Sequence, residues 1–130
     1  MQTILGAGGA IGVELANELT NYTKDIRLVS RNPKKINKND ETVSADLTVP
    51  LQVKKAVEGS EIVYLSAGLP YKTKVWEAKW SIIMDSVIEA CKHHNAKLVF
   101  FDNMYMYDAE RLDDMTEDTI INPSSKKGKL

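Results

Sequence analysis

The stretch "ILGAGGAIG", residues 4–12, places four glycines between an apolar run and the start of a helical pattern. Glycine loses more conformational freedom on folding than any other residue, so a cluster of glycines in one turn indicates a specific need. A glycine turn that leads from a strand into a helix presents free N–H groups at the positive end of the helix dipole. The stretch therefore predicts a phosphate-binding turn; the alternative is a tight turn that binds nothing.

The length and charge of the chain limit what it can be. It has 130 residues and a net charge of −1, and its length predicts one domain, residues 1–130. Balanced charge gives no support to binding of nucleic acid or of a membrane surface. The one cysteine cannot form an internal disulfide, no apolar run reaches the roughly 18 to 20 residues of a membrane span, and no secretory signal is recognisable. We therefore expect a cytoplasmic protein.

Strand and helix patterns alternate along the chain. Apolar runs predict strands over Met1–Leu5, Ile26–Ser30, Thr42–Asp46, Ile62–Ser66 and Lys97–Phe101. Helical spacing predicts helices over 11–19, from a Thr48 cap to about Gly59, and over Val75–His93, with a polar loop over Arg31–Glu41. This order predicts an α/β fold, a Rossmann-type doubly wound parallel sheet with strand order 3-2-1-4-5 and helices on both faces. Ligands of such folds bind beyond the carboxyl ends of the strands, at the switch point between strands 1 and 4.

Five stretches, in order along the chain, resemble one known family. They are "GAGGAIG" (6–12), "ADLT" (45–48), "VYLSAGLP" (63–70), "LVFFDNMYMYD" (98–108) and "INPSSKKGKL" (121–130). Together they are similar to the NAD-dependent epimerase/dehydratase branch of the extended short-chain dehydrogenase/reductase family. The resemblance implies a nicotinamide dinucleotide cofactor and hydride transfer on a small-molecule substrate, either a hydroxyl or carbonyl compound or a nucleotide sugar. It also admits a homo-oligomer.

The resemblance assigns cofactor-binding roles to residues at the ends of four strands. They are Gly6, Gly8, Gly9, Ala10, Ile11, Gly12, Ser30, Arg31, Asp46, Leu47, Ser66, Ala67 and Gly68. Asp46 would accept a hydrogen bond from the adenine amino group, or it is an ordinary aspartate of a surface turn. The small residues 66–68 would let the backbone pass close beneath a ribose, although strand-end packing also favours small side chains.

The end of the second predicted strand bears on the cofactor's phosphorylation state. A carboxylate there would accept the ribose 2′-hydroxyl, whereas an arginine accommodates a 2′-phosphate. Ser30 and Arg31 occupy this end, and no acid is present. We therefore expect NADP(H) to be favoured over NAD(H); the alternative is a solvated Arg31 before Pro33. The missing acid also disfavours a methyltransferase-like domain, a class that shares the glycine turn.

The catalytic pattern of the family is incomplete here. Asn103 stands at the usual Ser/Thr position, no tyrosine follows Tyr107, and position 128, where the resemblance would place the lysine, is a glycine. Tyr105 and Tyr107 are candidate substitute acids, or they pack beneath the cofactor. Because extended family members are roughly twice as long, we expect an N-terminal part that lacks the substrate region.

We expect an ordered core over about 1–107 and a tail over 108–130. The chain alone would then be inactive, and the alternative is a regulatory module that binds NADP without catalysis.

Other conspicuous side chains of the sequence predict packing and no metal site. Cys91 lies on the apolar side of its helix, and Trp76 and Trp80 are spaced as a packing pair. His93 and His94 end the same helix without an acidic or cysteine cluster at ligand spacing.

Overall fold

The fold is seen in a computed structural model that describes residues 1–67, 73–101, 116 and 118–122. Its elements are β1 (Gln2–Leu5), α1 (Ala10–Leu19), β2 (Ile26–Ser30), β3 (Glu41–Ser44), α2 (Pro50–Val57), β4 (Ile62–Leu65), α3 (Thr73–His94) and β5 (Lys97–Phe100). Every predicted element is present, and most boundaries shift by only one or two residues. Such shifts are normal where helix and strand ends fray.

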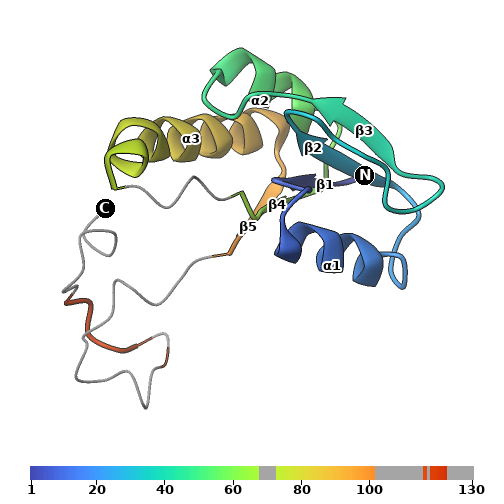
Figure 1. Cartoon of the computed structure of the whole chain (residues 1–130), viewed down its shortest axis with the longest axis horizontal. Helices are drawn as coiled ribbons and strands as arrows, with labels where there is room; N and C mark the ends of the chain where they lie inside the picture. The colour runs from blue at the N-terminus through green and yellow to red at the C-terminus, as the bar shows by residue number, and fades with distance from the viewer. Residues whose placement is uncertain (68–72, 102–115, 117, 123–130) are drawn as a thin grey trace.

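The five strands form one parallel sheet in the order β3-β2-β1-β4-β5. Leu5 at the end of β1 is level with Val29 on one side and Leu65 on the other, so these strands end together. Figure 1 shows α1 below the sheet and α2 and α3 above it. The predicted doubly wound fold, with its switch point between β1 and β4, is confirmed.

Neighbouring residues of each central strand supply two different cores. Ile4 and Leu28 are fully buried in a cluster with residues of α1, whereas Leu5 and Val29 are fully buried in a larger cluster with residues of α2 and α3. This is the alternation that a strand requires, because successive side chains point to opposite faces of the sheet. Burial on both faces explains why consecutive residues of these strands, such as Ile4 and Leu5 or Leu28 and Val29, are apolar.

The packing predictions for α3 are confirmed. Cys91 is buried in the larger core, and burial raises the pKa of its thiol. The rings of Trp76 and Trp80 pack with centroids 4.7 Å apart. At the end of α3, the His94 ring Nε2 lies 2.9 Å from the Lys54 carbonyl oxygen, where it donates a hydrogen bond that ties α3 to α2.

The predicted cap of α2 is wrong. The residue before the helix is Val49, and no side chain caps it. The Thr48 hydroxyl instead donates to Asp46 Oδ1 over 2.6 Å, and the Thr48 N–H donates to the same oxygen over 2.9 Å. The carboxylate is a stronger local acceptor, so Thr48 closes a turn after β3 and does not start the helix.

Several predictions fall on residues outside the described part of the chain. These are the cofactor residue Gly68, the catalytic candidates Asn103, Tyr105 and Tyr107, and most of the predicted tail over 108–130. None of the helices in the described ranges is long and apolar enough to cross a membrane.

Candidate functional site

The turn after β1 contains two glycines that the protein's own packing requires. Gly6 has a φ of +87°, and a Cβ there would lie 2.4 Å from the Cα of Ala67. A Cβ on Gly12 would lie 2.7 Å from the Gly6 carbonyl oxygen and 2.8 Å from the Cα of Ala7. Both positions therefore exclude any side chain, because β1 meets the start of α1 and the end of β4 at backbone contact distance.

The other two glycines of the turn have no such internal reason. Among the described residues, a Cβ on Gly8 would meet nothing within 4 Å, and a Cβ on Gly9 would meet only the Gly6 carbonyl oxygen, at an ordinary 3.7 Å. Both residues are exposed. A Cβ on either residue would project into this open space. Because neither residue has a side chain, the backbone of the turn is accessible from solvent.

The exposed turn leads into an uncapped helix end. Gly9 is the N-cap of α1, no side chain caps it, and no acidic residue lies in the first turn. The first N–H groups of any α-helix have no acceptor within the helix, and in α1 these are the N–H groups of Ala10, Ile11 and Gly12. The Val13 N–H is the first that bonds within the turn, to the Gly9 carbonyl oxygen over 3.0 Å. N–H donors at the positive end of a helix are chemically suited to an anion.

The end of β4 forms the opposite wall of this turn. The Ser66 N–H and Oγ both donate to the Leu5 carbonyl oxygen, over 2.9 and 3.2 Å, and Ala67 lies against Gly6. Ser66 and Ala67 are thus brought next to the glycine turn. Leu47, after β3, packs against the larger core together with Ala67.

Asp46 lies beyond the end of β3 and is a strong acceptor. The side-chain and backbone hydrogen bonds from Thr48 lower the pKa of its carboxyl below the ordinary 3.8, and the positive charges of Lys79 and Arg31 lower it further. Within the described part of the chain, the hydrogen bonds to this carboxylate engage Oδ1 alone. Asp46 is therefore ionised near neutral pH, and Oδ2 can accept from a ligand.

Ser30 is the last residue of β2, and Arg31 follows it directly. Arg31 is exposed and Ser30 is partly buried, and the positive charge of Arg31 makes a small contribution to the lowered pKa of Asp46. Lys79 of α3 is a further cation of this neighbourhood that the sequence reasoning missed. It is one of many lysines in the sequence, and its positive charge contributes to the lowered pKa of Asp46.

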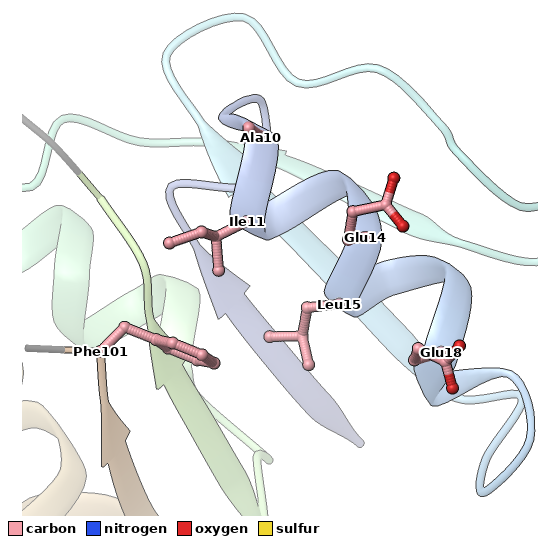
Figure 2. A pocket seen from close by; sticks show the side chains of 6 residues that line it. All are labelled: Ala10, Ile11, Glu14, Leu15, Glu18 and Phe101. Atoms are coloured by element: carbon pink, nitrogen blue, oxygen red, sulfur yellow. The ribbon is translucent and has the colours of Figure 1, made fainter.

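An apolar groove of about 440 Å³ runs along α1 beside the glycine turn. Figure 2 shows Ile11 and Leu15 of α1 facing Phe101, which follows β5, with the carboxylates of Glu14 and Glu18 on the outer side. The groove shares Ala10 and Ile11 with the helix start but extends down the flank of α1 to Glu18, away from the strand ends. It therefore adjoins the anion site without containing it.

The described residues do not bring together three His, Cys, Asp or Glu side chains that could hold a metal ion. His93 and His94 instead contact each other edge to face, with ring centroids 4.8 Å apart.

The family comparison agrees with the geometry of the turn. Residues 6–127 match the model of a protein family described as NAD(P)H-binding. No curated protein matches the sequence.

Solved structures share the fold at low sequence identity. Uronate dehydrogenase from Agrobacterium tumefaciens is 20% identical, with a TM-score of 0.82, over 98% of this chain and 50% of its own. A mutant of that enzyme complexed with NAD is 21% identical, with a TM-score of 0.82 and the same coverage. A Rossmann-fold NAD(P)-binding family protein from Shigella flexneri is 29% identical, with a TM-score of 0.61, over 76% of this chain and 49% of its own.

The chain spans about half the length of these structures. The family model, in contrast, covers nearly all of the chain, including the glycine turn and the four strands β2, β3, β4 and β5. With its Rossmann-type sheet and open glycine turn, the chain belongs to the NAD(P)H-binding family.

Proposed function

We propose that the chain is the nucleotide-binding part of an NAD(P)-dependent oxidoreductase or epimerase, of the extended short-chain dehydrogenase/reductase type, that prefers NADP(H) to NAD(H). Its substrate is a small hydroxyl or carbonyl compound or a nucleotide sugar; uronates are included because they are the substrates named for similar structures. The proposal includes a single folded unit over about residues 1–107, a cytoplasmic location and a homo-oligomer.

The observation that carries the proposal is the empty space at Gly8 and Gly9. Packing among the described residues does not require glycine at either position, whereas a pyrophosphate approaching the N–H groups of Ala10 and Ile11 needs both residues to lack side chains. In the proposal these N–H groups donate to the phosphate oxygens, and the positive end of α1 favours their charge. The cofactor then crosses the carboxyl ends of β1 and β4.

The rest of the dinucleotide extends to either side of this turn. On the side of β2 and β3, Asp46 Oδ2 accepts from the adenine amino group, Leu47 packs nearby, and Ser30 and Arg31 donate to the 2′-phosphate. On the side of β4, Ser66, Ala67 and Gly68 pass beneath a ribose. Arg31 offers a planar fork of permanently charged donors, which suits a phosphate better than a hydroxyl.

The bound nicotinamide ring supplies or accepts the hydride. The chain's own contribution to the chemistry rests on Asn103, Tyr105 and Tyr107, which follow β5 in sequence. The Asn103 amide hydrogen-bonds a substrate oxygen but cannot transfer a proton. Tyr105 or Tyr107 holds and donates the proton at that oxygen.

Titration calorimetry with NADPH and with NADH tests the proposal directly. We expect both to bind, with NADPH about tenfold to a hundredfold tighter, which corresponds to one charge-assisted contact of about 1.5 to 3 kcal/mol. S-adenosylmethionine is the control ligand and is expected not to bind. Absence of dinucleotide binding would refute the proposed function, and equal affinities would refute the preference alone.

A regulatory module that binds NADP without catalysis is the second candidate. It is favoured by one observation, the absence of any tyrosine after Tyr107 in a position to pair with a lysine. Turnover by the protein as it occurs in the cell, with a panel of alcohols, uronates and sugars, separates the two candidates.

A further inference from the structure

The loop between β2 and β3, residues 31–40, is fastened at its first residue. The Ser44 hydroxyl donates to the Arg31 carbonyl oxygen over 2.7 Å, and the Ala45 N–H donates to the neighbouring Ser30 carbonyl oxygen over 3.0 Å. Ser30 and Ser44 are also paired in the sheet. The exposed Arg31 side chain is therefore carried by a Cα whose preceding and following peptide groups are both held by hydrogen bonds.

The last residue of the same loop is a buried carboxylate. Asp40 is only 3% exposed, and its Oδ2 accepts from the N–H groups of Asn37, over 2.7 Å, and of Ile36, over 3.2 Å. A buried charge is tolerated when several N–H groups solvate it, so this arrangement constrains the loop backbone strongly. The Asp40 N–H closes the turn by donating to the Asn37 carbonyl oxygen over 3.1 Å.

Asn37 connects the loop to the helix that begins at the glycine turn. Its Nδ2 donates to the Ala16 carbonyl oxygen in α1 over 3.0 Å, and Ile36 packs against the core on the α1 side of the sheet. The loop that begins at Arg31 and the helix that begins at the pyrophosphate site are thus joined by a direct contact. This contact sets the spacing between the two elements.

The charged side chains over residues 31–39 of the loop are all positive. Residues 31–39 contain four cations, Arg31, Lys34, Lys35 and Lys38, and no acid. The carboxylate of Asp40 is buried among the loop's own N–H groups and faces none of these cations in an ion pair within the described structure. An anionic ligand that approaches Arg31 therefore meets a loop that is both cationic and already ordered, which reduces the entropy lost on binding.

We infer that Ser44, Asn37 and Asp40 are positioning residues for cofactor selection. They hold the β2–β3 loop so that Arg31 is presented to the 2′-phosphate at a fixed distance from the glycine turn. This inference rests on the proposed preference for NADP(H), and it goes beyond it by assigning the preference to residues that touch no part of the cofactor.

The experiment compares dissociation constants for NADPH and NADH across four proteins. They are the wild type, Ser44→Ala, Ser44→Thr and Asn37→Ala. Ser44 is exposed, so its variants should fold, and thermal unfolding checks Asn37→Ala. We expect Ser44→Ala and Asn37→Ala to weaken NADPH binding about threefold to tenfold, through loss of the side-chain hydrogen bonds that hold the loop, with NADH binding unchanged. Ser44→Thr keeps the hydroxyl and should keep the wild-type ratio.

A second readout reports on the loop itself. Trypsin cuts after Lys35 and Lys38 should be faster in Asn37→Ala than in the wild type, because the contact with α1 is lost, and Asn39→Ala, which alters an exposed neighbour, is the matched control. Faster cutting with an unchanged NADPH-to-NADH ratio would overturn the inference and leave the cofactor preference intact. Equal affinities in the wild type would instead overturn the preference, and the positioning role with it.

Discussion

Gly6 and Ala67 meet where the ends of β1 and β4 leave no room for a side chain. A Cβ on Gly6 would lie 2.4 Å from the Ala67 Cα and 2.5 Å from its backbone nitrogen, and the φ of +87° disfavours any L side chain there. Gly8, two residues later, has open space around it. The same turn therefore combines glycines that serve folding with glycines that leave space for a ligand.

Substitution of alanine separates these two roles. Gly6→Ala should lower the free energy of unfolding by about 2 to 5 kcal/mol, because a positive φ and a clash with backbone atoms act together. Gly8→Ala should leave stability unchanged or raise it slightly, since its Cβ meets nothing within 4 Å. Urea denaturation of the two variants makes the comparison, and equal stability would contradict the packing role of Gly6.

A valine at Gly9 should abolish dinucleotide binding while the sheet still folds. The position has an extended backbone, with φ −78° and ψ 168°, and a Cβ there meets only the Gly6 carbonyl oxygen at 3.7 Å. The branched side chain would occupy the approach to the free N–H groups of α1. Circular dichroism reports the fold and calorimetry the binding; wild-type affinity for NADPH in a folded Gly9→Val variant would exclude a phosphate at this turn.

Removal of the guanidinium at the end of β2 should remove cofactor discrimination. For Arg31→Ala we expect NADPH binding to weaken about tenfold to a hundredfold, with little change for NADH, because a charge-assisted contact of about 1.5 to 3 kcal/mol is lost. Lys38→Ala, in the same loop but seven residues on, is the matched control for a general loss of positive charge. A preference for NADPH that survives Arg31→Ala would assign the 2′-phosphate to other residues.

The Asp46 turn should contribute to stability in a pH-dependent way. The hydrogen bonds from Thr48 lower the pKa of the folded-state carboxyl below 3.8, so the carboxylate stabilises the fold above that pH. This contribution is lost as the pH falls through the folded-state pKa, where both states become protonated. Denaturation of the wild type and Asp46→Asn from pH 6 to pH 2.5 should show a difference that is constant near pH 6 and shrinks at the acid end. A pH-independent difference would be inconsistent with a lowered pKa.

The chain of 130 residues should bind cofactor without measurable turnover. Its sequence lacks the Tyr/Lys pair of the family it resembles, and it spans about half the length of similar solved structures. Purified chain is assayed for NADPH formation or consumption with uronates, alcohols and nucleotide sugars, next to an active dehydrogenase as positive control. Robust turnover would show that Asn103, Tyr105 or Tyr107 suffice for catalysis.

The sequence by itself determined the sheet order, the helix positions and the class of ligand. These features depend on local patterns. Apolar runs with β-branched residues form the buried strands, each crossover sets the next strand parallel, and the four glycines of residues 6–12 mark the turn where a backbone must be approached closely. The family comparison and the parallel sheet agree with these predictions. The predictions need no knowledge of contacts between residues that are distant along the chain.

Only the tertiary structure decided which polar groups meet. Thr48 serves Asp46 and not α2, Asp40 is buried within its own loop, Asn37 reaches α1, and Lys79 comes near Asp46. In the sequence alone, a polar side chain has several possible hydrogen-bond partners. Which partner it bonds in the folded protein depends on which groups folding removes from water. The sequence also could not separate Gly6 from Gly8. The difference between them is the backbone of Ala67, 61 residues away from Gly6 in the chain, which packing of β4 against β1 places 2.4 Å from where a Gly6 side chain would begin.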